Sequence, residues 1–432
     1  MRILHISTRL ILGGSQENTV LSCEGQARLG HEVHLAFGPI YGPEGSHLAR
    51  VEAFNAHARA RGGREIITHI VPDLVREISP FRDRRCRRQL RALIQRLRPD
   101  IVHTHSSKAG ILGRAAAWDA NRRLASGQGR CGVVHTIHGP PFMPVEGGAF
   151  KRLKVRMVNY GYTLAERYAA GRCHVIVSVA DAMTREFLAR GIGRPPQYLT
   201  VRSGMEVAPY LMATPGQTRV EVRARLGLSE ADFVVGTVAR LAEHKGHDDL
   251  LDAIGPDLKA NPRWKMLWVG NGWWRERLLA RARAMGLVVV ERDAKRASGT
   301  PRAGEAPPQV ILTGLVPPDQ IPGLIRAMDV LAHPSYREGL PRTVPQALLC
   351  AVCPVAYDVD GTGEVCRDME TGRLVPLADS TRLGEAVRWC AANPGARKQL
   401  AERGREECRV AFSAEKMVQE LEEVYRRALA GA

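Results

Sequence analysis

Short apolar segments typical of β-strands alternate with helix-like segments along the whole 432-residue chain. The alternation runs once, breaks, and starts again. The strand-like segments are residues 2–7, 31–37, 65–72, 100–106, 132–138 and 174–180, and then 233–239, 265–271, 310–314, 329–335 and 353–358. Such alternation is typical of βαβ units, in which helices connect parallel strands. The sequence therefore predicts an α/β protein built from two doubly wound, mainly parallel sheets.

The periodicity breaks at residues 207–218, VAPYLMATPGQT. We therefore expect one domain over residues 1–205, a second over 206–410, and a terminal segment, 411–432, that contains one long helix. Ligands of doubly wound sheets bind beyond the carboxyl ends of the strands. With two such domains, the expected site is the cleft between them.

The charge is uneven along the chain. The net charge is +17, from 62 Lys and Arg against 45 Asp and Glu, and residues 1–205 carry +16 of it. Residues 82–98 hold eight arginines on an amphipathic helical pattern, and residues 151–156 open a second basic helix. Basic surfaces attract phosphates, nucleic acids and anionic lipid headgroups. A solvated arginine-rich face is the alternative that the sequence leaves open.

No apolar run reaches the 18 residues of a candidate membrane span, and the first residues lack the cleavage site of a signal peptide. We therefore expect a cytoplasmic protein. The nine cysteines include one CxxC pair, Cys350 and Cys353, with no second pair or nearby histidines. Buried, reduced thiols are the expected state of this pair.

Two loops at predicted strand ends have residues suited to phosphate. Gly13 and Gly14 lie between the first strand and its helix, where the backbone can approach a ligand closely. Arg240 and Lys245 flank the loop after the strand 233–239. An arginine fork with a lysine point charge suits a diphosphate, whereas two solvated loop cations are the alternative.

Two further loops hold candidate groups of other kinds. Glu338 follows the strand 329–335, and Gly339 and Leu340, expected to lead into a helix, offer backbone N–H groups. A carboxylate beside a phosphate site is suited to bind a hydroxyl and not the anion. His138 ends the strand 132–138 and can donate to a sugar hydroxyl or act near a reaction centre.

Two histidines of the neighbouring strand, His103 and His105, lie on one face of it. We expect them to pack in the core or to support the site from behind.

Taken together, these pieces resemble the retaining glycosyltransferases of family four. The resemblance covers essentially the whole chain, and its specificity comes from the order and spacing of the pieces. They are MRILHISTRLILGGSQE, VHTHSSKAGILGR, HTIHGPPF, GTVARLAEHKGHDDLL and HPSYREGLPRTVPQALLCAVCPVAYDVDG. The resemblance implies the GT-B fold, with two Rossmann-like domains facing a central cleft and the last helix packing back on the first domain.

The resemblance also implies roles for single residues. Gly13 and Gly14 would contact the donor phosphates from the first domain. Arg240 and Lys245 would neutralise the diphosphate as the bond to the sugar breaks. His138 would contact the donor sugar.

On the second domain, Glu338 matches the first member of the family's glutamate pair, near the donor sugar. Gly339 and Leu340 would give backbone contacts to it, and Val316 would meet the nucleobase. The second glutamate of the pair is replaced by Gln346, eight residues after Glu338. A neutral amide keeps both hydrogen-bonding functions but loses the charge, which predicts weaker or altered ribose binding.

A DxD sequence, Asp358 to Asp360, follows the strand 353–358. This pattern binds a divalent ion in the other large glycosyltransferase fold. Here Asp and Gly are ordinary loop formers, and the two cations are available for the diphosphate, so we expect no metal.

The predicted reaction transfers a sugar, with retention, from a UDP- or GDP-sugar to an acceptor hydroxyl in polysaccharide or lipid-linked glycan synthesis. The donor is a substrate, and no permanently bound cofactor is expected. A lipid-linked acceptor at an anionic membrane surface would suit the basic residues 82–98 and 151–156, and the protein would then be peripheral at the inner face of the membrane. The alternatives are a nucleotide-sugar epimerase on the same fold and, last, a nucleic-acid binder. The 82–98 stretch has no aromatic residue for base stacking, so we expect no nucleic-acid partner.

Overall fold

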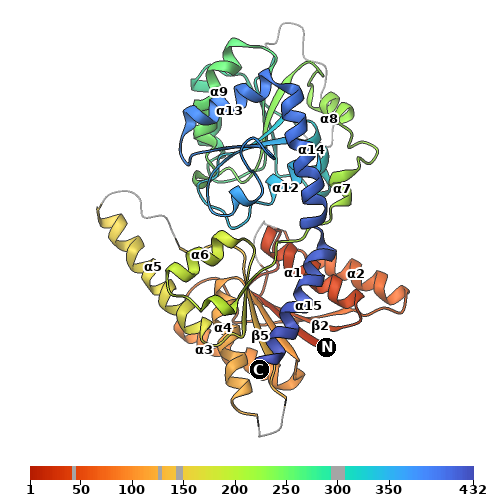
Figure 1. Ribbon diagram of the computed structural model, residues 1–432, viewed down its shortest axis with the longest axis vertical. Helices are drawn as coiled ribbons and strands as arrows, with labels where there is room; N and C mark the ends of the chain where they lie inside the picture. The colour runs from red at the N-terminus through yellow and green to blue at the C-terminus, as the bar shows by residue number, and fades with distance from the viewer. Residues whose placement is uncertain (41–44, 125–128, 143–148, 293–306) are drawn as a thin grey trace. The chain divides into compact units, whose positions relative to one another are not determined.

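The computed structural model describes residues 1–40, 45–124, 129–142, 149–292 and 307–432, and the side chains of residues 149–151 lie outside this description. The chain forms two compact units (Figure 1). Unit 1 comprises Met1–Met205 together with Ala414–Ala432, and unit 2 comprises Glu206–Ser413. The last helix, α15 (Ala414–Ala430), therefore belongs to the same unit as the first strand.

Unit 1 is built on a seven-stranded sheet in the order β3-β2-β1-β4-β5-β6-β7, in which every pair is parallel. The strands are β1 (Arg2–Ser7), β2 (Glu32–Phe37), β3 (Ile66–Ile70), β4 (Ile101–His105), β5 (Gly132–Ile137), β6 (Val175–Ser178) and β7 (Tyr198–Thr200). The strand order reverses at β1, which pairs with both β2 and β4. Ligands of doubly wound sheets bind at this switch point, beyond the carboxyl ends of the strands.

Helices cover both faces of this sheet, because alternate strand residues point to opposite sides. On one face, Ile3 and Ile101 pack with Met417, Leu421 and Tyr425 of α15. The helices of unit 1, besides α15, are α1 (Gly14–Arg28), α2 (Leu48–Ala60), α3 (Pro80–Leu97), α4 (Ser107–Asn121), α5 (Ala149–Ala170) and α6 (Asp181–Ala189).

The other face of the sheet is covered by α3 and α4. The amphipathic pattern read in residues 82–98 is the buried face of α3, where Cys86, Leu90, Leu93 and Ile94 enter the core. Burying four such side chains stabilises the fold by several kcal/mol, at about 1.5–3 kcal/mol for each large one.

Unit 2 repeats the plan with the strand order β10-β11-β9-β8-β12-β13-β14, again parallel throughout. Its strands are β8 (Phe233–Val238), β9 (Trp264–Val269), β10 (Val289–Glu291), β11 (Val310–Gly314), β12 (Val330–His333), β13 (Cys353–Tyr357) and β14 (Arg373–Val375). Its switch point is β8, which pairs with β9 on one side and β12 on the other. The two parallel sheets confirm the α/β, doubly wound architecture predicted from the sequence.

Helices again form two layers in unit 2. The helices are α7 (Ala208–Leu211), α8 (Arg219–Leu226), α9 (His247–Ala260), α10 (Arg275–Ala284), α11 (Ile321–Arg326), α12 (Thr343–Leu349), α13 (Ser380–Ala392) and α14 (Pro394–Ala411). Helices α9, α10, α13 and α14 bury one face of the sheet, and α8, α11 and α12 bury the other. Within the described part of the chain, no helix has both the length and the apolar content needed to cross a bilayer.

Candidate functional site

The loop after β8 is held against the loop after β12 by a glycine. Gly246 has a positive φ of 64°, and a Cβ at this position would lie 1.8 Å from the carbonyl oxygen of Pro334. Both the conformation and the close approach therefore require glycine. As a result, Lys245, the residue before this glycine, lies beside the segment that contains Glu338.

Glu338 is the centre of this group. Its Oε1 lies 2.5 Å from the Nζ of Lys245 and 3.1 Å from the Nε2 of His333, the last residue of β12. The side chains of Glu338, Lys245 and His333 are 14%, 19% and 8% exposed. Burial alone would raise the pKa of Glu338, but attraction to Lys245 and the contact with His333 outweigh it and hold the pKa below its usual range. The carboxyl group is therefore ionised at neutral pH.

Arg240 lies on the same loop but has a different environment. Its side chain is exposed, and its guanidinium carbon lies 5.5 Å from the centre of the Trp273 ring. Its backbone oxygen accepts a hydrogen bond from the Nε2 of His247, at 3.1 Å, which anchors the loop to the start of α9. The loop thus carries one partly buried, paired cation, Lys245, and one exposed cation, Arg240.

Asp360 has a structural role that the sequence reasoning missed. Its Oδ2 accepts a hydrogen bond from the backbone N–H of Glu338, at 2.6 Å, and the N–H of Gly361 donates to the oxygen of Gly339, at 3.1 Å. Asp360 itself has a positive φ of 48°. The second aspartate of the DxD sequence therefore orders the Glu338 loop. His333 was also missed, because a histidine at a strand end gives no signal of a partner five residues later.

The helix expected after Glu338 is α12 (Thr343–Leu349). Gly339 and Leu340 do not lead directly into it, because α12 starts at Thr343. Pro341 keeps Leu340 outside the helix, since the residue before a proline avoids the helical conformation. Leu340 is buried, 8% exposed, against the rest of unit 2.

The remaining predicted residues of unit 2 lie on other elements. Val316 follows β11 and packs, half-buried, against the core that α8 and α11 share. Gln346 is 9% exposed within α12. In the described part of the chain, neither residue forms a hydrogen bond or an ion pair with Glu338, whose partners are Lys245, His333 and Asp360.

In unit 1, the loop after β1 brings Gly13 and Gly14 to the start of α1. Gly13 is extended, with a φ of −175°, which any residue adopts, and a Cβ there would meet only the flexible side chain of Gln16. The chain conformation therefore does not explain why position 13 is glycine.

A pocket of about 160 Å³ opens beyond the carboxyl ends of β4 and β5. Ser15, Ser106, His138 and Glu166 line it together with Phe187. A larger cavity of about 480 Å³ lies at the opposite, amino end of the same strands, away from the predicted site. The described part of unit 1 therefore places one candidate site residue, His138, in a small pocket at the strand ends, with both polar and apolar lining residues.

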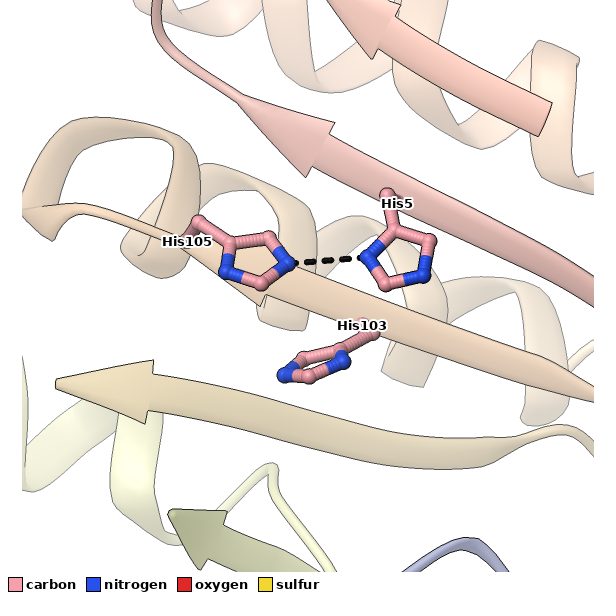
Figure 2. Close-up of side chains that lie close together, drawn as sticks. All are labelled: His5, His103 and His105. Atoms are coloured by element: carbon pink, nitrogen blue, oxygen red, sulfur yellow. Dashed lines mark hydrogen bonds between the residues drawn. The ribbon is translucent and has the colours of Figure 1, made fainter. Parts of the chain in front are cut away.

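Behind this pocket lies a buried cluster of three histidines, His5, His103 and His105 (Figure 2). The ring of His105 connects the cluster to His138, since its Nδ1 lies 3.2 Å from the Nε2 of His138. The Nδ1 of His5 in turn lies 2.9 Å from the Nε2 of His105. The sequence had left His103 and His105 between packing and support of the site, and His105 contacts the candidate residue directly.

Comparison with known proteins identifies the two units. Residues 12–201, within unit 1, match the profile of Glycosyltransferase Family 4, and residues 232–393, within unit 2, match that of Glycosyl transferases group 1. The chain is a glycosyltransferase that combines a family 4 domain with a group 1 domain. The family predicted from the sequence motifs is thereby confirmed.

Individual relatives of this glycosyltransferase have named activities. The UDP-Gal:alpha-D-GlcNAc-diphosphoundecaprenol alpha-1,3-galactosyltransferase of Escherichia coli is 27% identical over 313 residues, 72% of this chain and 70% of the relative. The capsular polysaccharide biosynthesis glycosyltransferase CapM of Staphylococcus aureus is 20% identical over 386 residues, 87% of this chain and 90% of the relative.

Among solved structures, Anabaena HepE in complex with UDP and glucose has a TM-score of 0.71 at 18% identity, with 99% of each chain covered. This likeness confirms the predicted GT-B fold for the glycosyltransferase.

Proposed function

We propose that this glycosyltransferase moves a sugar from a nucleoside diphosphate sugar, with UDP as the favoured nucleotide, to a hydroxyl of a lipid-linked glycan. The observation that carries the proposal is the partly buried Lys245–Glu338–His333 group, with exposed Arg240 on the same loop as Lys245, at the carboxyl ends of β8 and β12. The HepE complexes, with UDP and with UDP-glucose, support the choice of UDP. The names of the E. coli and S. aureus relatives support a lipid-linked or surface glycan as acceptor.

Lys245 and Arg240, the two cations of the loop after β8, bind the diphosphate in different ways. A lysine ammonium has three N–H donors, and Glu338 takes one of them. The other two remain for phosphate oxygens, while the pairing fixes where the ammonium lies. Arg240 adds an exposed, planar donor fork that suits a phosphate. Together they neutralise the charge that develops on the diphosphate as it leaves.

Glu338 serves the sugar and not the phosphate. An ionised carboxylate repels a phosphate but accepts hydrogen bonds from sugar hydroxyls, and its pairing with Lys245 keeps it ionised. Gly339 and Leu340 add backbone contacts, Val316 meets the base and Gln346 meets the ribose. In unit 1, Gly13 and Gly14 let the backbone approach the phosphates, and His138 contacts the donor sugar from its pocket.

The reaction proceeds with retention of the anomeric configuration. The bond between the anomeric carbon and the diphosphate oxygen breaks, and the acceptor oxygen bonds to the same face of that carbon. The proton of the acceptor hydroxyl passes to the departing diphosphate oxygen. No metal takes part, because Arg240 and Lys245 supply the positive charge. Asp360 is engaged with the backbone of Glu338, which supports this assignment.

A panel of UDP-sugars and GDP-sugars, with and without undecaprenyl-diphosphate-linked sugar and always with EDTA, tests the proposal. We expect nucleoside diphosphate release with one donor only when the acceptor is present, and a strong loss of release in Arg240→Ala. Arg263→Ala is the matched control, because this exposed arginine lies before β9, at the other end of the same sheet. Conversion of the donor sugar without release would instead show an epimerase.

The acceptor is met at an anionic membrane surface, and α5 is the element that supports this part of the proposal. Leu153, Met157, Tyr160 and Leu164 are 57%, 68%, 64% and 45% exposed. Their spacing of four, three and four residues places them on one stripe of the helix. The basic residues 152, 154 and 156, also exposed, flank the stripe. An exposed apolar stripe with flanking cations is suited to an anionic bilayer surface.

Helix α3 contributes less than its arginine count predicts. Of its basic side chains, Arg82 and Arg85 pair with Asp73, and Arg87 pairs with Asp119. The side chain of residue 151, the first of the predicted basic segment 151–156, lies outside the described residues. The apolar stripe of α5 is therefore the better surface to test.

Co-sedimentation with phosphatidylglycerol vesicles, phosphatidylcholine vesicles and DNA tests the membrane contact. We expect binding to the anionic vesicles alone, and its loss in Met157→Ser/Tyr160→Ser. Val410→Ser, on the exposed side of α14, is the matched control. Equal binding of both variants, or binding to DNA alone, would remove α5 as the membrane contact.

A further inference from the structure

A continuous chain of buried side-chain hydrogen bonds leads from the last helix to the pocket of unit 1. It begins at Tyr425 of α15, whose hydroxyl lies 2.7 Å from the Nε2 of Gln26 on α1. The Oε1 of Gln26 lies 2.7 Å from the Nε2 of His5 on β1. His5 then contacts His105 of β4 at 2.9 Å, and His105 contacts His138 at 3.2 Å. This chain of bonds, here called the relay, thus connects the four elements α15, α1, β1 and β4 with the residue that follows β5.

A second branch leaves the same tyrosine. The Tyr425 hydroxyl also lies 2.8 Å from the Nδ1 of His103, whose Nε2 lies 2.7 Å from the Oγ1 of Thr136. Tyr425, His103 and His5 are fully buried, at 0% exposed. The cluster in Figure 2 is therefore the middle of a larger network.

The three buried rings of the network, those of His5, His103 and His105, are neutral. Burial lowers the pKa of His5 to about 4 and lowers the pKa values of His103 and His105 well below their usual range. A neutral imidazole has one N–H donor and one acceptor nitrogen. One ring's orientation therefore decides the tautomer of the next, and the chain of bonds has a single direction.

The amide of Gln26 sets that direction. Because its Nε2 donates to Tyr425, its Oε1 must accept, and His5 donates from Nε2. The Nδ1 of His5 then accepts from the Nε2–H of His105, and the Nδ1 of His105 accepts from the Nε2–H of His138. If the Gln26 amide were rotated so that Nε2 and Oε1 exchanged places, donor and acceptor would be exchanged in every hydrogen bond of the relay.

We propose that Gln26, His5 and His105 are positioning residues that hold the His138 ring in one orientation, with its proton on Nε2. Tyr425 fixes the far end of this relay, so α15 acts on the pocket through it. The proposal rests on the role of His138 in the proposed function. In this proposal helix α15 helps to orient His138, in addition to covering one face of the sheet.

A shared metal ion is the competing explanation of the cluster, since one ligand atom from each of His5, His103 and His105 lies within 4.8 Å of the others. However, all six ring nitrogens of these histidines already have side-chain partners. A metal would have to break several of these bonds. The closed network accounts for the three rings without it.

Ring-nitrogen NMR of the full-length protein, labelled with ¹⁵N on histidine, tests the relay without any need for activity. The His138 signals are assigned from His138→Gln. We expect a single tautomer of His138 with the proton on Nε2 in the wild type, and a mixture of tautomers in His5→Phe and in the milder Gln26→Met. The matched control is His34→Phe, which removes a 2.9 Å bond between His34 and His69 on neighbouring strands β2 and β3, outside the relay.

Each other outcome overturns the proposal. An unchanged His138 signal in both relay variants would show that the relay does not set the tautomer. A mixture of His138 tautomers, or a proton on Nδ1 of His138, in the wild type would contradict the direction of the hydrogen bonds in the relay. Stoichiometric zinc in the purified protein would show that the histidine cluster is a metal site and not a relay. The transfer assay adds a second readout, in which His5→Phe and Gln26→Met lower kcat/KM by about tenfold and His34→Phe does not. His138→Gln in that assay tests the proposed function separately, because the NMR result stands without it.

Discussion

Replacing Lys245 by methionine should destabilise unit 2 far more than replacing an exposed lysine. The substitution keeps the length of the side chain but leaves the Glu338 carboxylate, 14% exposed, with His333 as its remaining side-chain partner. Removing one member of a buried ion pair costs about 3–5 kcal/mol, and the residual exposure of this pair places the expected loss at about 3 kcal/mol. Glu338→Gln in the same chain should recover most of it, so the two substitutions couple by about 2 kcal/mol.

Urea unfolding followed by tryptophan fluorescence measures this loss in the right part of the molecule. Five of the six tryptophans lie in unit 2, and Trp118 alone lies in unit 1. Lys259→Met, at an exposed site of α9, is the control and should change the free energy of unfolding by less than about 0.5 kcal/mol. If Lys245→Met matched this control, or if the coupling energy were below about 0.5 kcal/mol, the buried ion pair would not stabilise unit 2 as argued.

Three further predictions follow from the same structure. Burial lowers the pKa values of His5 and His247 to about 4, so near and below pH 6.5 these two histidines bind more protons in the unfolded chain than in the folded one. Each histidine should therefore lower the free energy of unfolding by about 2 kcal/mol when the pH falls from 7.5 to 5. A urea midpoint that did not change over this pH range would contradict the prediction. Gly246→Ala should cost about 3 kcal/mol, because it adds a clash to a positive φ, whereas Gly227→Ala, with a similar φ and open space around it, should cost about 1 kcal/mol in the same assay. Glu338→Gln should tighten UDP binding in calorimetry, because it removes a negative charge beside the diphosphate, while it slows transfer; weaker UDP binding would place this carboxylate on the phosphate side.

The strands and the parallel sheets were predictable because they depend on local patterns. The segment 2–7 was predicted as a strand and is β1, and the apolar positions of residues 82–98 are the buried face of α3. The periodicity of a strand or a helix can be recognised from a few adjacent residues. The position of Leu340 outside α12 could also be predicted from the sequence, since Pro341 follows it.

The partners of the candidate residues were not predictable in this way. Lys245 and Glu338 are 93 positions apart, and Gln26 and Tyr425 are 399 apart, so no local pattern links them. The number of arginines in a segment also does not show which carboxylates lie next to them in the fold. The ion pairs of Arg85 and Arg87 with aspartates of other segments were therefore not predicted. These contacts are fixed by the tertiary fold, which brings together strand ends and helices that are distant in the sequence.

Thermal unfolding with UDP, GDP or ADP, each in EDTA, tests the central claim most directly. A nucleotide at about 100 times its dissociation constant stabilises the protein that it binds by about 2.7 kcal/mol. The account predicts a raised midpoint with UDP, kept in Arg263→Ala and lost in Arg240→Ala/Lys245→Met. No shift with any of the three nucleotides, or a shift that appears only after manganese is added, would contradict a metal-free nucleoside diphosphate site at Arg240 and Lys245.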